Sequence, residues 1–200
     1  MADRGARADL IALYAFDREI ARAAQVASNP LLGEIRLAWW REAMDEIFAG
    51  ARVRRHPVLE ALALMRRRSD LSEERLKAAI DARHDDLSPD PVADEAALNA
   101  YLDAAHGSIM LEAARRLDPS VSPKSVRLCA RAWGLAKLDP RRLSADWTAA
   151  GLLTSAAAES AALPPRAFPA AAHVALLRAP HAGPLPRRSR LWRAVLKGRV

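Results

Sequence analysis

Helix-capping signals divide this sequence, because a residue that can cap a helix stands directly before proline at Asn29–Pro30 and at Ser122–Pro123. Proline suits the first turn of a helix, and the side chain before it can accept a hydrogen bond from a free backbone N–H. Only 5% of the residues are aromatic, and Ala, Leu, Arg and Glu fill most of the segments between such signals. This pattern favours helix over sheet and predicts an all-α fold.

Apolar residues at helical spacing predict helices between these stop signals. The expected ranges are 9–27, 30–49, 57–68, 73–84, 95–117, 123–138, 155–162 and 168–177. Ser72 and Asp94 are further expected N-caps. The segment 181–186 is expected to be a linker, because glycine and two prolines fall within its sequence HAGPLP. We expect one helical domain over residues 1–180, and a linker with a basic amphipathic helix over residues 181–200.

The net charge of +7 is concentrated at the C-terminal end. From Ser160 to Val200 there are eight basic and no acidic residues, whereas the first 159 residues carry 23 basic and 24 acidic side chains. A neutral body argues against a nucleic-acid groove, so no nucleic acid partner is expected. The basic end instead predicts contact with an anionic membrane surface or a partner protein. Because no apolar run reaches the roughly 20 residues of a membrane-spanning helix, the expected location is cytoplasmic, either free or peripheral on the inner membrane.

The final segment, RRSRLWRAVLKGRV, can form an amphipathic helix. Its apolar face would carry Leu191, Trp192, Val195 and Leu196. Two roles stay open for this helix: Trp192 docks it onto the body with the arginines in water, or the helix contacts a membrane or a partner groove. The candidate membrane or partner residues are Arg188, Trp192, Arg193 and Lys197.

The residues give little sign of metal chemistry. Asp86 and Asp90 have the i,i+4 spacing that could present two carboxylates to Mg²⁺, but Pro89 lies between them. Asp81 and Asp85 share this spacing, although charge runs of this kind usually form a solvated face. The sequence has no HExxH, no CxxC, no GxSxG and no glycine-rich phosphate loop. No metal or cofactor is therefore expected from these patterns.

Several segments resemble the squalene/phytoene synthase family. The resemblance begins with LIALYAFDREIARA, NPLLGEIRLAWWREAMDEIFAG and RRHPVLEALA, and continues through DARHDDL and AYLDAAHGSIMLEAARRL to PLPRRSRLWRAVLKGRV. It is greatest to a divergent branch that includes a mitochondrial complex I assembly factor and its alphaproteobacterial relatives. The resemblance implies a single-domain, all-helical isoprenoid-synthase fold around a central cavity, here in a shortened form.

Individual positions match the motifs of that family. The matches are Trp40–Arg41 for its WR, His56–Pro57 for its HP, Asp86–Leu87 for its DL, and Tyr101 and Gly107 for its Tyr…Ala-Gly helix. In that helix His106 replaces the usual Ala and Met110 replaces the second Gly, which predicts a narrower cavity. From its position alone, beside Gly107, the His106 imidazole could face a cavity, but a satisfied core histidine is the more common case.

Both aspartate-rich motifs of the family are missing. Members that join two prenyl diphosphates carry DDxxD just after an aromatic-Cys-Arg segment, which is held here by Phe16, Asp17 and Arg18, and residues 21–25 contain no carboxylate. The second motif should follow AWGLA, but a turn or two of helix is absent there, and Asp139 and Asp146 are poor substitutes. Ionising a diphosphate needs metal-ion support worth several kcal/mol of transition-state stabilisation.

The sequence therefore predicts a non-catalytic scaffold or assembly factor of the respiratory complex I type. The alternative is a Mg²⁺-dependent enzyme that condenses prenyl diphosphates head to head in isoprenoid biosynthesis. Its metal ligands would come from Asp17, Glu19, Asp81 and Asp85. Mg²⁺ is expected only under this alternative.

A set of basic, acidic, aromatic and small residues is expected to line the cavity or bind a diphosphate, and a prenyl lipid is a possible ligand. The candidates are Arg18, Arg22, Arg41, Asp86, Tyr101, His106 and Gly107. The arginines have an alternative interpretation as ordinary helix-surface charge. Arg41 is also spaced for an i,i+4 ion pair with Asp45.

Overall fold

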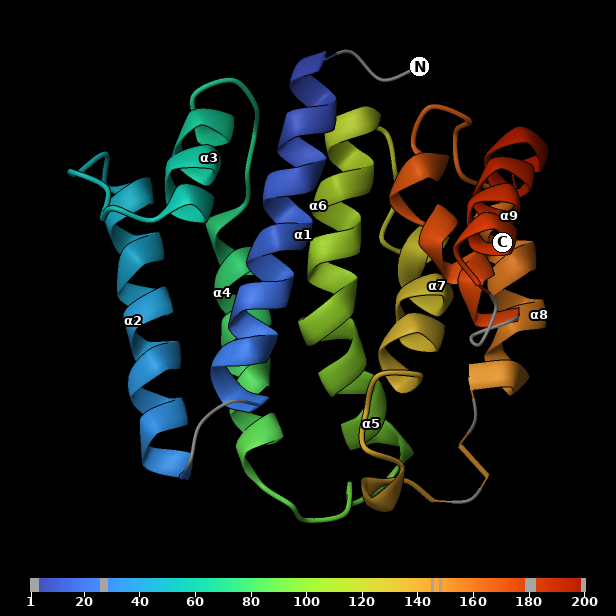
Figure 1. Cartoon of the computed structure of the whole chain (residues 1–200), viewed down its shortest axis with the longest axis horizontal. Helices are drawn as coiled ribbons and strands as arrows, with labels where there is room; N and C mark the ends of the chain where they lie inside the picture. Colours follow the sequence, from blue (N-terminus) through green and yellow to red (C-terminus); the bar gives the residue numbers. More distant parts are fainter. Residues whose placement is uncertain (1–3, 26–28, 145, 148, 179–182, 199–200) are drawn as a thin grey trace.

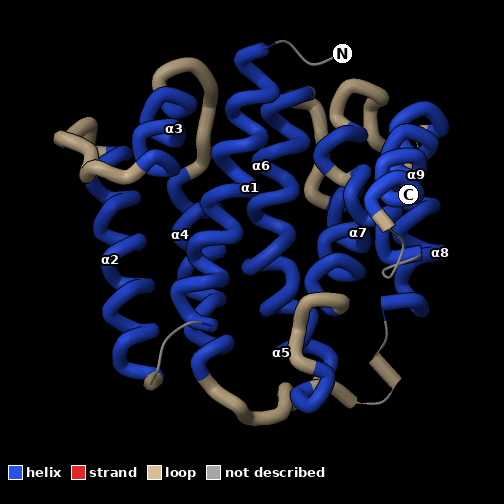
Figure 2. Tube along the Cα trace, in the orientation of Figure 1, coloured by secondary structure: helices blue, strands red, loops and turns tan. Residues whose placement is uncertain are grey.

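The computed structural model describes residues 4–25, 29–144, 146–147, 149–178 and 183–198. Within these ranges the regular structure consists of α-helices and shorter helical turns, and no strand occurs (Figure 2). The prediction of an all-α fold is confirmed. No helix within the same ranges is both long enough and apolar enough to cross a membrane.

The N-terminal part consists of four α-helices and one 3₁₀ turn. These are α1 (Arg4–Gln25), α2 (Pro30–Phe48), α3 (Pro57–Arg66), α4 (Glu73–Ala82) and the 3₁₀ turn η1 (Arg83–Leu87). Helix α1 packs against α2 and α3 on one side and against the later helix α6 on the other. The side chains that fill this packing are fully buried and include Leu13, Phe16, Leu37, Met44, Leu59 and Ile80. Each such side chain stabilises the fold by roughly 1.5–3 kcal/mol.

One long helical rod crosses the middle of the molecule. It is built from α5 (Glu95–Leu102), the π-helical segment η2 (Asp103–Gly107) and α6 (Ser108–Leu117). This agrees with the expected helix over 95–117, except for the π segment. Such segments are rare and often occur at functional sites.

The C-terminal part packs beside this rod. It consists of α7 (Lys124–Leu135), η3 (Pro140–Arg142), α8 (Ala149–Ser160), η4 (Phe168–Ala170), η5 (Ala172–Arg178) and α9 (Pro184–Lys197). Figure 1 shows α1 and α6 together in the centre, with α2, α3 and α4 on one side and α7, α8 and α9 on the other. The expected end of the first helix, at Ala27, lies outside the described residues.

Most of the predicted N-caps are present. The side chains of Asn29, Ser72 and Asp94 accept hydrogen bonds from the backbone N–H groups of the residues three positions later, at 3.0, 3.3 and 2.8 Å. Ser122 does not cap its helix, because α7 starts at Lys124 without a side-chain cap. The Ser122 hydroxyl lies 3.1 Å from that of Ser125 instead.

Three other local predictions are wrong. The range 168–177 forms two 3₁₀ segments, η4 and η5, instead of an α-helix. Pro184 and Pro186 belong to the first turn of α9, where proline has no N–H to lose, so the predicted linker is partly helical. The Arg41–Asp45 pair does not form: Arg41 pairs with Asp81 of α4 at 2.5 Å, and Asp45 pairs with a lysine of α4.

Helix α9 is docked on the body through small and aliphatic residues. Ala194 is buried and Leu191 packs on the core, next to η5. Trp192 is 68% exposed. The interpretation in which Trp192 docks the helix onto the body is therefore wrong. The division at residues 180 and 181 stays a prediction.

Candidate functional site

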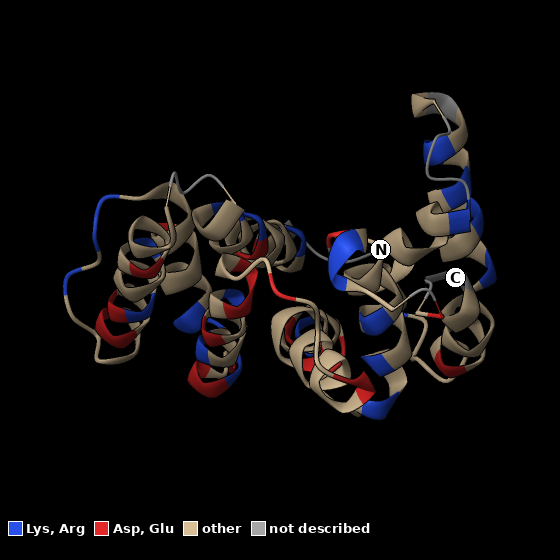
Figure 3. Ribbon diagram, turned by 90° about the horizontal axis from the view of Figure 1, so that it is seen from below, with Lys and Arg blue, Asp and Glu red and all other residues tan. Residues whose placement is uncertain are grey.

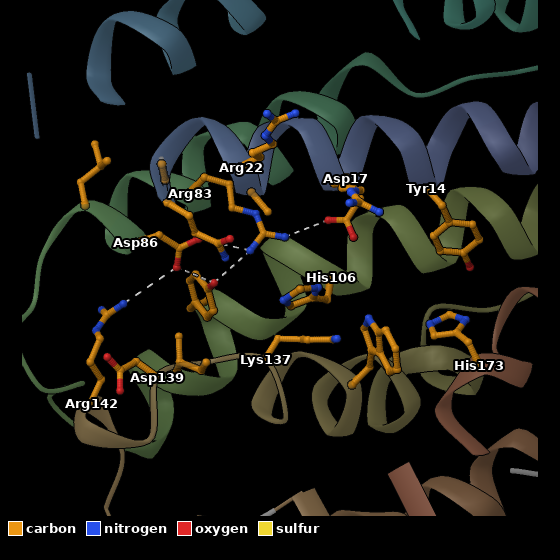
Figure 4. A pocket seen from close by; sticks show the side chains of 18 of the residues that line it. Tyr14, Asp17, Arg22, Arg83, Asp86, His106, Lys137, Asp139, Arg142 and His173 are labelled. Atoms are coloured by element: carbon orange, nitrogen blue, oxygen red, sulfur yellow. Dashed lines mark hydrogen bonds and ion pairs between the residues drawn. The ribbon is translucent and has the colours of Figure 1, made fainter. Parts of the chain in front are cut away.

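A cavity of about 1320 Å³ lies between α1, η1, the α5–η2 rod, α7, η5 and α9. Figure 4 shows Arg83, Asp86 and Arg142 toward one end of it, and Tyr14 and His173 toward the other. Five basic and three acidic side chains line it, which gives a formal excess of two positive charges. These are Arg18, Arg22, Arg83, Lys137, Arg142, Asp17, Asp86 and Asp139.

Arg83 is the centre of the charged end. Its residue is only 3% exposed, and its guanidinium lies between two carboxylates, 2.8 Å from Asp17 Oδ1 and 3.3 Å from Asp86 Oδ2. Arg83 also donates a hydrogen bond to the Tyr101 hydroxyl at 3.1 Å. Buried charges persist when they are paired and hydrogen-bonded, and these contacts provide both conditions.

Asp86 has further partners around this guanidinium. The Tyr101 hydroxyl donates a hydrogen bond to Asp86 Oδ1 at 2.7 Å, and Arg142 lies 3.9 Å from the same oxygen. The charges of Asp17, Arg83, Asp86 and Arg142 therefore balance within one connected network (Figure 4). The cations that line the cavity but lie outside this network are Arg18, Arg22 and Lys137.

Burial controls the protonation of the groups along the cavity. It raises the pKa of Asp17, although the neighbouring Arg83 acts in the opposite direction. Burial lowers the pKa of His106 well below 6.5, assisted by the charge of Arg83, and lowers the pKa of His173 to about 4. Both imidazoles are therefore neutral near pH 7. The Nδ1 atom of His106 has no hydrogen-bond partner within the described part of the chain.

Two glycines allow the walls of the site to approach closely. A Cβ at Gly33 of α2 would lie 2.2 Å from a Leu87 methyl carbon, so the absence of a side chain lets η1 pack on α2. A Cβ at Gly134 of α7 would lie 2.3 Å from Cδ2 of His106. The positions of η1 and of the His106 ring thus depend on these glycines.

Comparison with known families agrees with this helical architecture. The model of the squalene/phytoene synthase family matches residues 1–137, which is more than half of the chain. The chain belongs to the squalene/phytoene synthase family. No curated protein and no solved structure matches it. The relation to one divergent branch of the family stays a prediction.

The squalene/phytoene synthase resemblance implies Mg²⁺ on clustered aspartates, and the residues at this cavity do not fit that ion. The two most buried carboxylates, Asp17 and Asp86, share the guanidinium of Arg83. Asp139 caps η3 and pairs with Arg141 at 3.2 Å. Over the described ranges, no three or more His, Cys, Asp and Glu side chains gather where they could hold a metal ion. Hard divalent cations need several oxygen ligands together, and an excess of positive charge opposes their binding.

The alternative metal ligands of the sequence analysis are scattered. Of the four, only Asp17 lines the cavity. Glu19 lies at a separate hollow on α1 and α2, Asp81 is tied to Arg41, and Asp85 is exposed.

The structure brings together most of the residues predicted for the cavity. Arg18, Arg22, Asp86, Tyr101 and His106 all line it. Arg41 and Gly107 do not line it. Arg41 is held at the surface by Asp81, with side-chain exposures of 46% and 51%. The predicted surface set Arg188, Trp192, Arg193 and Lys197 is exposed on α9.

Sequence reasoning missed Arg83, Lys137, Arg142 and His173 as lining residues. Arg83 stands three residues before the predicted Asp86, which was the available signal for it. Lys137 and Arg142 follow α7, at the place where the second aspartate motif was expected. Of the two residues predicted to narrow the cavity, His106 lines it, whereas Met110 is buried in the core and does not line it.

Proposed function

We propose that this squalene/phytoene synthase relative does not catalyse prenyl transfer and acts as a membrane-peripheral scaffold, an assembly factor of the respiratory complex I type. The observation that carries the proposal is the Arg83 guanidinium between Asp17 and Asp86. Arg83, which is fixed on η1, neutralises the two carboxylates that a metal cluster would need. Without metal ions, the departing diphosphate loses several kcal/mol of transition-state stabilisation, and every 1.36 kcal/mol is a factor of about ten in rate.

The exposed face of α9 supports peripheral attachment to a membrane. Trp192 is 68% exposed and Leu196 is 79% exposed, while Arg188, Arg193 and Lys197 surround them on the same helix. Figure 3 shows basic residues repeated along the ribbon that leads to the C-terminus. Apolar side chains flanked by arginines and lysines are typical of helices that lie in the interface of an anionic bilayer. The assembly role itself is supported by the resemblance to the branch that includes a complex I assembly factor.

Catalysis is tested with the purified full chain. We expect no hydrocarbon product and no pyrophosphate release from farnesyl or geranylgeranyl diphosphate in the presence of Mg²⁺, while a working family synthase in parallel gives both. The open cavity of about 1320 Å³ favours one alternative, a Mg²⁺-dependent synthase. Product that forms with Mg²⁺ and disappears with EDTA would establish that alternative and refute the proposal.

Membrane attachment is tested by sedimentation with vesicles. We expect the chain to sediment with vesicles that contain phosphatidylglycerol and to stay in the supernatant with phosphatidylcholine alone. The Trp192→Ala/Leu196→Ala variant should lose most of this binding. The control Leu31→Ala/Leu64→Ala, which truncates two exposed leucines on other helices, should not. Equal losses in both variants would contradict a role of α9.

A further inference from the structure

Helix α2 exposes a strip of apolar side chains on its outer face. Leu31 is 67% exposed and Ile35, one turn later, is 56% exposed, and Leu32 and Ala38 beside them are exposed as well. Figure 1 shows α2 at the edge of the helical array, and the described chain leaves this face uncovered. Scattered exposed leucines are ordinary, whereas neighbouring ones are typical of contact surfaces. These four residues are called the α2 strip below.

A hollow of about 420 Å³ lies beside the α2 strip, between α1 and α2. Its apolar lining consists of Ala23, Ile35, Trp39 and Trp40. The Trp39 ring is held by edge contact with Trp40, at 5.2 Å between ring centroids, and by the Arg54 guanidinium, 5.2 Å from its centroid. A wall fixed in this way can accept an apolar side chain without first losing conformational freedom. The hollow therefore suits a protruding residue such as a leucine.

The α2 strip and the hollow are spaced for a second copy of this chain. Ile35 stands four residues after Leu31 and four residues before Trp39, which is about 6 Å in each direction along the helix. If two α2 helices pack antiparallel about a two-fold axis at Ile35, Leu31 of each copy lies opposite Trp39 of the other. Each copy then contributes one protruding leucine and one hollow, so the contact is reciprocal and closes after two chains.

The charges at the rim of the hollow agree with self-association. Glu19, Arg22 and Arg36 border it, and none of them belongs to an ion pair within the described ranges. A rim of a single sign would repel its own copy, whereas Glu19 of one chain can pair with Arg36 of the other. Glu34 and Glu42, which α2 also exposes, make this helix less favourable for contact with an anionic bilayer.

We infer that two copies of this chain associate through the α2 strip as an antiparallel, two-fold pair, in which Leu31 of each copy enters the hollow of the other. The contact covers about two turns of α2, or about 12 Å of helix. It is therefore smaller than the roughly 800 Å² per partner of a standard interface, and the dimer forms reversibly as the concentration of the chain increases. This surface lies outside the large cavity, so the inference is independent of whether the chain catalyses prenyl transfer.

Sedimentation velocity of the full chain, measured without lipid from low to high micromolar concentration, tests the association. The sedimentation coefficient should rise from that of a monomer to that of a dimer and no further. Leu31→Asp/Ile35→Asp, which places charge on the α2 strip, should weaken the dimer at least about tenfold, or about 1.4 kcal/mol. The control Leu64→Asp/Leu196→Asp changes two exposed leucines on α3 and α9 and should leave the dimer unchanged.

A charge exchange tests whether the rim joins two copies. Glu19→Arg should weaken the dimer at least about threefold, because repulsion replaces two symmetry-related pairs of charges. Glu19→Arg/Arg36→Glu should restore the original affinity. Since Glu19 and Arg36 form no ion pair within one chain of the described structure, such a rescue identifies a contact between copies.

Disulfide formation tests the register of the two helices. Under mild oxidation Ile35→Cys should give a cross-linked dimer, because residue 35 faces its own counterpart across the two-fold axis. Leu31→Cys should cross-link far more slowly, since the two copies of residue 31 lie about 12 Å apart along the pair and a disulfide needs Cα atoms within about 7 Å. The native Cys129 is buried and does not compete.

Four results would overturn the inference. The first is a chain that stays monomeric at every concentration, and the second is a dimer that persists in Leu31→Asp/Ile35→Asp. The third is a series of growing oligomers or faster cross-linking through Leu31→Cys than through Ile35→Cys, since either excludes the two-fold pair. The fourth is loss of vesicle sedimentation in Leu31→Asp/Ile35→Asp without any self-association of the original chain, which would assign the α2 strip to the membrane.

Discussion

Replacing Arg83 by glutamine should destabilise the folded chain by about 3 kcal/mol near pH 7. Removal of one partner from a buried ion pair costs about 3–5 kcal/mol, because the remaining charge stays buried without compensation. Arg83 touches Asp17 at 2.8 Å and Asp86 at 3.3 Å. The lower end of the range applies because Asp86 keeps its hydrogen bond from Tyr101, and because Asp17 can take up a proton.

The loss should also depend on pH. Burial already raises the folded-state pKa of Asp17, and Arg83 opposes this rise, so the pKa rises further in the variant. A carboxyl whose pKa is higher in the folded state loses stability as pH increases from its unfolded toward its folded pKa. The difference in the free energy of unfolding between the original chain and the Arg83→Gln variant should therefore be smaller near pH 5 than near pH 7.

Urea unfolding followed by circular dichroism measures both effects. Arg41→Gln is the matched control, since its pair with Asp81 is about half exposed and such pairs contribute only about 0.2–1 kcal/mol. In Arg83→Gln/Asp17→Asn, part of the loss should be recovered, because residue 17 no longer carries a buried charge and Asp86 keeps Tyr101 and Arg142. The reasoning is refuted if Arg83→Gln costs no more than Arg41→Gln, or if the pH trend has the opposite sign.

Three further predictions follow from buried groups. Gly134→Ala should lower the free energy of unfolding by about 1–3 kcal/mol through overpacking against His106. Gly183→Ala, where nothing lies within 4 Å of the added Cβ, changes only the N-cap of α9 and should cost less; equal melting temperatures of the two variants would contradict this. The pKa of His173 is about 4, so an NMR titration should show a neutral ring down to about pH 5, with the His173→Gln variant identifying its signal. The contribution of His173 to the free energy of unfolding should be lost as pH falls from about 6.5 toward 4. Burial raises the pKa of the Cys129 thiol to about 12, so it should react with a disulfide reagent only after unfolding; rapid labelling of the folded chain would contradict its burial.

Sequence predicted the features that depend on neighbouring residues. The caps at Asn29, Ser72 and Asp94 could be found because the capping side chain and the N–H that it accepts from are three residues apart. Ion pairs between residues that lie far apart in the sequence could not be found in this way. Arg41 had a carboxylate one turn away in Asp45, but α4 brings Asp81 closer to it.

Arg83 shows why the centre of the site was missed. Its neighbours Asp81 and Asp85 made the segment look like one solvated charged face, and both are exposed. The chain changes from α-helix to 3₁₀-helix at Arg83, which changes the turn from about 3.6 to about 3.0 residues. That change alters which side chains face inward, and periodicity calculated for a single helix type does not reveal it.

The charges that line the cavity show how a metal-dependent fold could become unfavourable for its metal ion. The carboxylates Asp17 and Asp86 are neutralised by Arg83 and Arg142, so the field in the cavity comes from Arg18, Arg22 and Lys137. Such a field opposes divalent cations and favours anions over the same surface. Removal of Arg83 alone would leave these three cations in place. It would free Asp17, while Asp86 would keep Tyr101 and Arg142, and an Mg²⁺ site needs more oxygen ligands than one carboxylate supplies. Under the proposed loss of the metal site several positions contribute at once, so we expect that no single substitution at this cavity creates an Mg²⁺ site.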